Sequence, residues 1–101
     1  MTDADLLREA ADRLGGLASR STPGDWRTTG LLASRPEVVA HRPDGGTEHV
    51  AEARAASAAW ITALSPAVAE PLGDWLRAEA ERGAPTAAAL ALARLLLART
   101  T

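Results

Sequence analysis

The stretch Ser57–Arg82 carries the clearest helix start and stop signals in this chain of 101 residues. Serine accepts a hydrogen bond from the free backbone N–H groups at a helix start, so Ser57 predicts the N-cap of a short helix over residues 58–64. Ser65 followed by Pro66 predicts a second start, because proline at the first helical position sacrifices no hydrogen bond. These signals require helices in the C-terminal half of the chain.

Apolar residues at helical spacing predict which sides of these helices are buried. Trp60 and Leu64 lie one turn apart, so we expect both to point into the core. In the next segment the apolar side is formed by Val68, Leu72, Trp75 and Leu76. Pro71 cannot donate a backbone hydrogen bond, which predicts a break or kink, with the main helix running from Pro71 to Arg82 and Gly83 as its C-terminal cap.

The N-terminal segment Thr2–Ser19 predicts an amphipathic helix. Thr2 and Asp5 have the spacing of a capping box. The Gly15-Gly16 pair costs roughly 2 kcal/mol relative to alanine inside a helix, so it indicates that the helix frays or ends there, or that it packs closely against a neighbour. One apolar side is formed by Leu6, Leu7, Ala10, Ala11, Leu14, Leu17 and Ala18.

The middle of the chain has the features of a β-hairpin. Residues 37–42 (EVVAHR) form the best strand candidate, and Thr47–Ala51 is its expected partner. Between them, Asp44-Gly45 is a favoured two-residue hairpin loop. With that loop, Val39 would face Val50 and His41 would face Glu48. Trp26 follows a turn-forming cluster and is expected to begin a short third strand, whereas the structure of residues 30–35 stays open.

Strand and helix patterns are segregated along the chain, which disfavours a parallel α/β fold. We therefore predict one α+β domain over residues 1–101: an N-terminal helix, a small antiparallel β-sheet made of the hairpin plus a short strand, then three C-terminal helices. The chain has no Phe and no Tyr. Its core must be built from Leu, Val, Ala and Trp, so helices should approach closely.

Composition and motifs disfavour several classes of function. The formal net charge is −2 and no basic patch is visible, so we expect no nucleic-acid partner. The longest apolar run is short and interrupted by Arg, so we expect no membrane partner. The absence of Cys fits a cytoplasmic protein. No phosphate-binding loop, zinc motif or nucleophile elbow occurs, so we predict no catalytic residues, no cofactor, no metal and no enzymatic activity.

Two constellations near the predicted sheet could bind ligands. An exposed Trp26 beside Arg27, together with His41, would line a groove between sheet and helix for a small ligand or nucleotide; the other interpretation, which we favour, is that Trp26 closes the core. At the hairpin tip, His41, Glu48 and His49 suggest a metal or acid–base site. A third ligand at fixed spacing is missing, so we interpret the tip as a solvated polar end with one cross-strand ion pair.

The last predicted helix, from Thr86 or Ala87 to Arg99, is apolar on nearly all sides. At 100° per residue, Leu92, Leu95 and Leu96 gather on one side and Leu90 and Leu97 on another. One side can pack on the protein's own core, and the other then requires a second chain. We therefore predict a homodimer whose interface includes Leu90, Leu92, Leu95, Leu96 and Leu97, without a choice of side.

Several short motifs occur in a recognisable order: LREAADRL, then STPG followed by Trp26, then the Val-rich hairpin, then AAWITALSP and an L-x-x-W-L segment. This order resembles a family of small phage and prophage proteins that includes the ead-type accessory proteins of lambdoid phages and actinobacterial hypothetical proteins. The sequence departs from the family pattern at Asp25, Ser57, Trp60 and Pro71. The resemblance implies an accessory protein of a phage or integrated element that acts through other macromolecules.

These observations favour a non-enzymatic, oligomeric protein-interaction module of phage or mobile-element origin, with another protein as a further partner. A sharper form of the hypothesis is an inhibitor of a host defence system. The alternative is a small-ligand or nucleotide-binding module with its groove near Trp26, Arg27 and His41.

Overall fold

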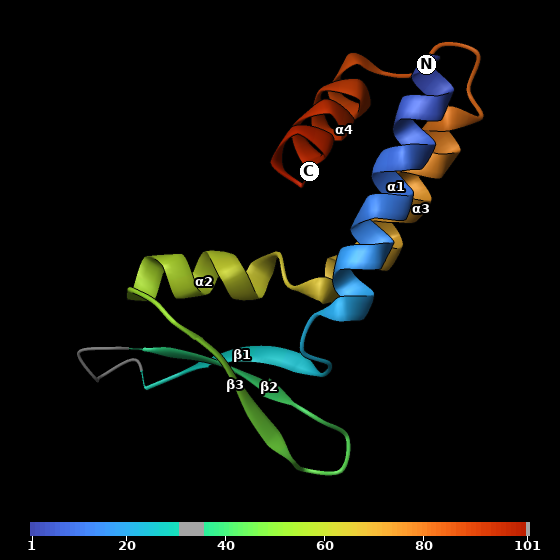
Figure 1. Ribbon diagram of the computed structural model, residues 1–101. Coiled ribbons are helices and arrows are strands. Elements are labelled where there is room, and N and C mark those ends of the chain that lie inside the picture. The colour runs from blue at the N-terminus through green and yellow to red at the C-terminus, as the bar shows by residue number, and fades with distance from the viewer. Residues whose placement is uncertain (31–35, 101) are drawn as a thin grey trace. The chain divides into compact units, whose positions relative to one another are not determined.

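A computed structural model of the chain describes residues 1–30 and 36–100. The fold is α+β, with an N-terminal helix, a three-stranded antiparallel sheet and helices, as the sequence predicted (Figure 1). Most of the stretch 30–35, whose structure the sequence left open, lies outside the described residues. The elements are α1 (Asp3–Arg20), β1 (Asp25–Thr29), β2 (Glu37–His41), β3 (Thr47–Glu52), α2 (Ala55–Ala63), a 3-10 turn (Pro66–Val68), α3 (Ala69–Ala80) and α4 (Ala87–Arg99).

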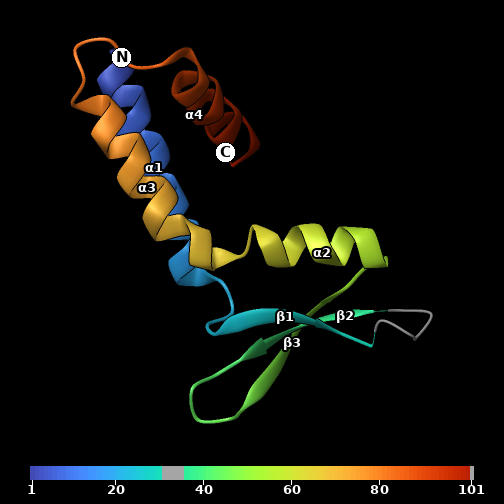
Figure 2. The same cartoon turned by 180° about the vertical axis from the view of Figure 1, so that it is seen from behind.

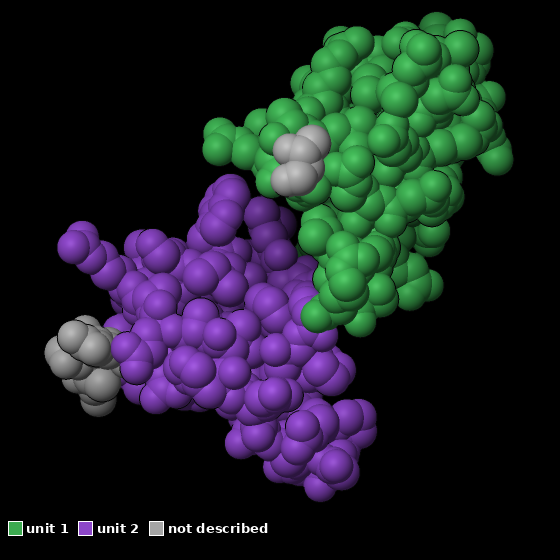
Figure 3. Space-filling model, in the orientation of Figure 1, with its two compact units in different colours: residues 1–20, 68–101 green, residues 21–67 purple. Residues whose placement is uncertain are grey.

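The chain forms two compact units (Figure 3). The helical unit consists of residues 1–20 and 68–101 and contains α1, α3 and α4, while the sheet unit consists of residues 21–67 and contains the sheet and α2. The prediction of three helices as one C-terminal group is therefore wrong. Only the last two helices are C-terminal, and α2 belongs with the sheet. The single domain over residues 1–101 stays a prediction.

Helix α1 begins at the predicted capping box. The Asp5 N–H donates to Thr2 Oγ1 at 3.1 Å and the Thr2 N–H donates to Asp5 Oδ2 at 3.2 Å. These bonds, above all the one from the Thr2 backbone, lower the pKa of the Asp5 carboxyl. Both expectations for the Gly15-Gly16 pair are wrong. The helix does not end there but continues to Arg20. The pair also makes no close contact with a neighbouring element, because a Cβ on Gly15 would meet nothing within 4 Å and a Cβ on Gly16 would meet only the Arg20 side chain.

Small residues form the core of the helical unit. Leu7 and Leu76 are its large, fully buried side chains. Around them the buried positions are Ala10, Ala11, Ala80, Ala89 and Ala93. Helix α1 contacts both α3 and α4, and the two views of the ribbon show α3 running alongside it (Figure 2). The alanine side chains let these helices approach closely, as the composition predicted.

Helix α3 buries a different face from the one predicted. Its buried residues are Ala69, Gly73, Leu76, Glu79 and Ala80, whereas Trp75 is 40% exposed. The prediction that Trp75 shares the inner face with Leu76 is therefore wrong. The inner face carries small residues that suit close contact with α1, and Trp75 lies about 100° away from Leu76 around the helix axis.

The start of α3 is close to the prediction and its end is not. Ser65 Oγ accepts a hydrogen bond from the Ala67 N–H at 3.4 Å, at the head of the 3-10 turn. Pro71 then lies in the first turn of α3, where its missing N–H is tolerated. At the other end the helix closes at Glu81 in a right-handed conformation, and Gly83 is not among the glycines with positive φ, so the predicted glycine cap is wrong.

A buried carboxylate connects α3 to α4. Glu79 is 4% exposed, and its Oε1 accepts a hydrogen bond from Thr86 Oγ1 at 2.6 Å. Thr86 is also the N-cap of α4, where its hydroxyl accepts from the Ala89 N–H at 3.3 Å. Arg82 Nε lies 3.0 Å from Glu79 Oε2, a close charge pair whose geometry is not that of a hydrogen bond. The Thr86 hydroxyl therefore both donates to the buried Glu79 carboxylate and caps the start of α4.

The sheet has the strand order β1-β2-β3 and both pairs are antiparallel, which confirms the expected three-stranded arrangement. Strand β1 begins at Asp25, one residue before the predicted Trp26. Trp26 pairs with Ala40 and Thr28 with Val38. Val38 and Ala40 are buried, and α2 contacts β1 and β2, so this face of the sheet is the one that α2 covers (Figure 1).

The hairpin loop has three residues in place of the predicted two. The Arg42 N–H donates to the Gly46 carbonyl at 2.8 Å and the Gly45 N–H donates to the Arg42 carbonyl at 3.0 Å. Gly45 has a φ of 87°, the left-handed conformation that closes a hairpin of this kind. The longer loop shifts the register by one residue, so the predicted pairs are wrong: His41 faces Thr47, and Val39 faces His49.

A bulge between Val38 and Val39 then restores the register farther from the loop. Val38 pairs with Ala51 and Glu37 pairs with Glu52, so Val50 is the extra residue of β3. At the tip, the expected cross-strand ion pair forms between Arg42 Nη1 and Glu48 Oε2, which lie 3.8 Å apart. His49 Nδ1 lies 2.9 Å from Glu37 Oε2, across the sheet and away from the tip.

We predict that Thr86→Ala destabilises the protein by about 2 kcal/mol, because the helix loses its cap and a buried carboxylate oxygen loses its donor. Urea unfolding followed by circular dichroism measures the change. Thr86→Ser keeps the hydroxyl and should retain most of the stability. An alanine variant as stable as the serine variant would show that the shared hydroxyl contributes nothing.

Candidate functional site

Helix α2 carries no charged residue in its nine positions, AASAAWITA. Its N-cap is Arg54, which adopts an extended conformation and makes no side-chain capping bond. The predicted N-cap, Ser57, lies inside the helix and is wrong, because the chain turns helical directly after β3 and Ala53. The early start places Ala58 against the sheet, where it is fully buried.

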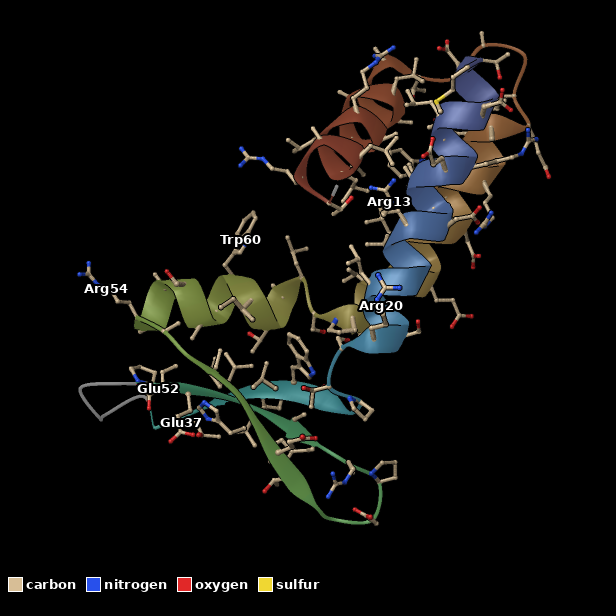
Figure 4. The ribbon with its side chains drawn as sticks, viewed as in Figure 1. Arg13, Arg20, Glu37, Glu52, Arg54 and Trp60 are labelled. Atoms are coloured by element: carbon tan, nitrogen blue, oxygen red, sulfur yellow. The ribbon has the colours of Figure 1, made fainter. Side chains whose placement is uncertain are left out.

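Trp60 and Leu64 lie on the outer side of α2. Trp60 is 69% exposed and Leu64 is 55% exposed, so the prediction that both point into the core is wrong. Trp60 projects from α2 away from the sheet (Figure 4). The physical reason is geometric: two residues along a helix turn the side chain by about 200°, so a helix that buries Ala58 must expose Trp60.

The exposed side of α2 forms one continuous apolar surface, which we name the α2 face. The neighbours of Trp60 on this side are alanines, and Leu64 follows one turn after it. All of its members are classed as exposed: Ala56, Ala59, Trp60, Ala63 and Leu64. Exposed apolar surface that includes a tryptophan is typical of interaction sites, since tryptophan is enriched among the residues that dominate binding energy.

The N-terminal end of the α2 face is electropositive. The first N–H groups of a helix lack partners within the helix, and they carry its positive dipole end. Arg54 adds a full positive charge there, and no acid occupies the first turn. Within the described part of the chain no ion pair to Arg54 is found, and its side chain extends from the start of α2 into solvent (Figure 4).

The residues of the predicted ligand groove are not brought together on one face. Trp26 is half-buried on the side of the sheet that α2 covers, and its Nε1 donates to the Thr22 carbonyl at 2.9 Å. Arg27 and His41 are exposed, and strand alternation places them on the opposite face. There Arg27 Nε pairs with Asp25 Oδ2 at 2.7 Å.

The leucines of α4 flank an inner stripe made of Ala89 and Ala93, which are fully buried. The sequence left open which of the two predicted leucine groups faces the core. The alanine stripe runs between the two groups, so both lie at its edges and neither forms the inner side by itself. Four of the five pack partly buried against the protein's own core: Leu90, Leu92, Leu96 and Leu97. Leu95 is 53% exposed, with Arg94 and Arg99 also on the outside. Self-association through α4 stays a prediction.

Within residues 1–30 and 36–100, no group of three or more His, Asp or Glu residues could hold a metal ion. Among the helices of the same residues, none combines the length and apolar character that a membrane crossing requires. The α2 face is therefore the strongest candidate site on the described surface.

Sequence reasoning missed this site because no side of α2 carries a charged residue that would mark it as the outer side. Trp60, Leu64 and Ile61 are all larger than Ala58, and hydrophobicity alone assigns the largest to the core. The available signal was the absence of charge in AASAAWITA, which is unusual for a helix exposed on one side.

We predict that Trp60→Ala changes the free energy of unfolding by no more than about 0.5 kcal/mol, as expected for a surface substitution. The matched change Leu76→Ala removes a fully buried side chain and should cost about 2–5 kcal/mol. Chemical denaturation of both variants tests this. Equal losses would place Trp60 in the core.

Comparisons with protein-family models, curated proteins and solved structures returned no match. The resemblance to phage accessory proteins therefore rests on the sequence motifs alone.

Proposed function

We propose that this protein is a non-enzymatic protein-interaction module that works as a homo-oligomer and through at least one other protein. The observation that carries the proposal is the α2 face, a charge-free apolar surface that contains a tryptophan 69% exposed. Holding such a large side chain in water is unfavourable by roughly 2 kcal/mol relative to burial. A partner that covers Trp60 recovers this free energy.

The shape of the surface favours a macromolecular partner over a small ligand. Ligand sites are concave and enclose most of the ligand. One side of a helix is convex, and a partner protein with a complementary groove or helix fits it better. The small-ligand alternative is less well supported, because Trp26 and the pair Arg27 and His41 lie on opposite faces of the sheet.

The first test uses the tagged protein as bait in a lysate of its source cells. The bound proteins are quantified by mass spectrometry. A tryptophan at the centre of an interface contributes 2 kcal/mol or more, so Trp60→Ala should weaken capture of a genuine partner by about 30-fold. Trp75→Ala removes another exposed tryptophan, on α3, and should leave that capture unchanged. Partners retained equally by all three baits would contradict the proposal.

The sequence motifs support a phage-derived or mobile-element origin, and with it an inhibitor of a host defence system as the sharper form of the function. Phage plated on a defended host measures this. Expression of the wild-type chain should restore plaque formation, and Trp60→Ala should not. Equal plating with and without the gene, across several defence systems, would exclude the inhibitor while leaving the interaction module.

A further inference from the structure

We infer that the α2 face binds the α2 face of a second copy of this chain, with the two helices antiparallel about a two-fold axis. The inference rests on the proposed function as an interaction module and names one partner and one contact surface for it. It also differs from the interface predicted on α4. Three properties of the described residues carry it: the lack of charge, the polarity of the helix and the positions of the alanines.

A surface that binds itself must be free of like charges at its centre, because a two-fold axis brings each residue near its own copy. The α2 face satisfies this condition, since the helix contains no Asp, Glu, Lys, Arg or His. The competing surface on α4 does not. Around its exposed Leu95 lie Arg94 and Arg99, which are also exposed, so two copies of that surface would bring four guanidinium groups together.

Helix polarity selects the antiparallel arrangement. At the start of α2, Arg54 and the unpaired first-turn N–H groups are all positive. At the other end the last carbonyl groups carry the negative end of the dipole, and Leu64 caps the helix through the Trp60 carbonyl. An antiparallel pair places each Arg54 beside the carbonyl end of the other helix. A parallel pair would place Arg54 against Arg54.

The register follows from the helical positions. At 100° per residue, Ala56 and Ala63 lie at the centre of the face, with Trp60 and Ala59 on either side of it. A two-fold axis at this centre passes between positions 59 and 60. Ala56 then faces Ala63 of the second copy, whereas on one side of this contact Trp60 lies beside Trp60 of the other copy, and on the other side Ala59 lies beside Ala59. The alanines allow close approach, and each indole ring becomes buried.

The size of the face indicates a weak dimer. The nine residues of α2 span about 14 Å, so the two faces bury less than the roughly 1,200 Å² at the low end of stable interfaces. We therefore expect a dissociation constant in the high micromolar range. Covalent trapping is more sensitive than chromatography for such a complex.

The chain has no cysteine, which allows a direct test by disulfide trapping. Two variants, Ala56→Cys and Ala63→Cys, are prepared separately, one with a tag that changes its mass. They are oxidised at high micromolar concentration, alone and mixed. In the antiparallel register only the mixture brings the two thiols opposite each other, so the mixed dimer should form at least about ten-fold faster than either same-variant dimer.

The outer side of α4 supplies a matched control. Ala91 and Ala98 are exposed alanines with the same spacing, so Ala91→Cys and Ala98→Cys, mixed in the same way, report random collision. Adding Trp60→Asp to the α2 variants should reduce the mixed dimer to this control rate. Far-UV circular dichroism checks that each variant keeps its helix content.

Each other outcome overturns the inference. Equal rates for mixed and same-variant α2 dimers would exclude the antiparallel register. A mixed rate no faster than the α4 control would exclude the α2 face, and a faster α4 pair would place the dimer on α4. If trapping fails while Trp60→Ala still loses a captured partner, this inference falls and the proposed function stands.

Discussion

Close packing of small side chains is the constraint on which the rest of this structure depends. Among the described residues, every buried hydrophobic residue other than Leu7, Val38 and Leu76 is an alanine. An alanine buries little apolar area, so each contributes less than a buried leucine. The helices compensate by approaching closely, and a large side chain at such a contact would hold them apart. The tryptophans are therefore excluded from the tightest contacts.

The same constraint raises the importance of the polar contacts that position the helices. Helix α4 packs on α1 through Ala89 and Ala93, which give little apolar area. Its start is also held by Thr86, which binds the buried Glu79, and near its end the Arg13 side chain donates to the Thr100 carbonyl at 3.0 Å (Figure 4). Hydrogen bonds to charged groups contribute more than neutral ones, particularly where one partner is buried. Polar contacts thus hold both ends of a helix whose middle is packed by alanine.

The exposed apolar surface of α2 is a consequence of the same packing. The fully buried Ala58 lets the helix lie close to β1 and β2, and Trp60 and Leu64 are left on the outer side. Trp60 and Leu64 then require another molecule to remove them from water. The packing of α2 on the sheet through Ala58 therefore produces both the core of small residues and the exposed surface that carries Trp60 and Leu64.

Local signals in the sequence determined most of the elements. The capping box at Thr2 and Asp5, the start signal Ser65-Pro66 and the turn at Asp44-Gly45 act over a few residues, so their effect could be predicted without knowledge of the fold. The segregation of strands from helices likewise determined the α+β class. The signals failed where two local solutions compete. Asp44-Gly45 suits a two-residue loop, but Gly45 serves equally well as the left-handed residue of a three-residue loop, and the register of His41 follows from that choice.

Only the tertiary structure decided which side of each helix is buried. No side of α2 carries a charge, and in α3 the charged residues Glu70, Asp74 and Arg77 mark only the outer side. Periodicity therefore does not choose between tryptophan and alanine for the inner face, and the rule that the largest residue goes inside assigned Trp60 and Trp75 wrongly. The face is chosen by the surface opposite, which accepts Ala58 on the sheet and the alanines of α3 on α1. Such a contact depends on the shape of two segments at once. No local sequence pattern specifies the shape of the opposite surface. The candidate site is the side of α2 that this packing leaves exposed, so it could not be predicted from the sequence for the same reason.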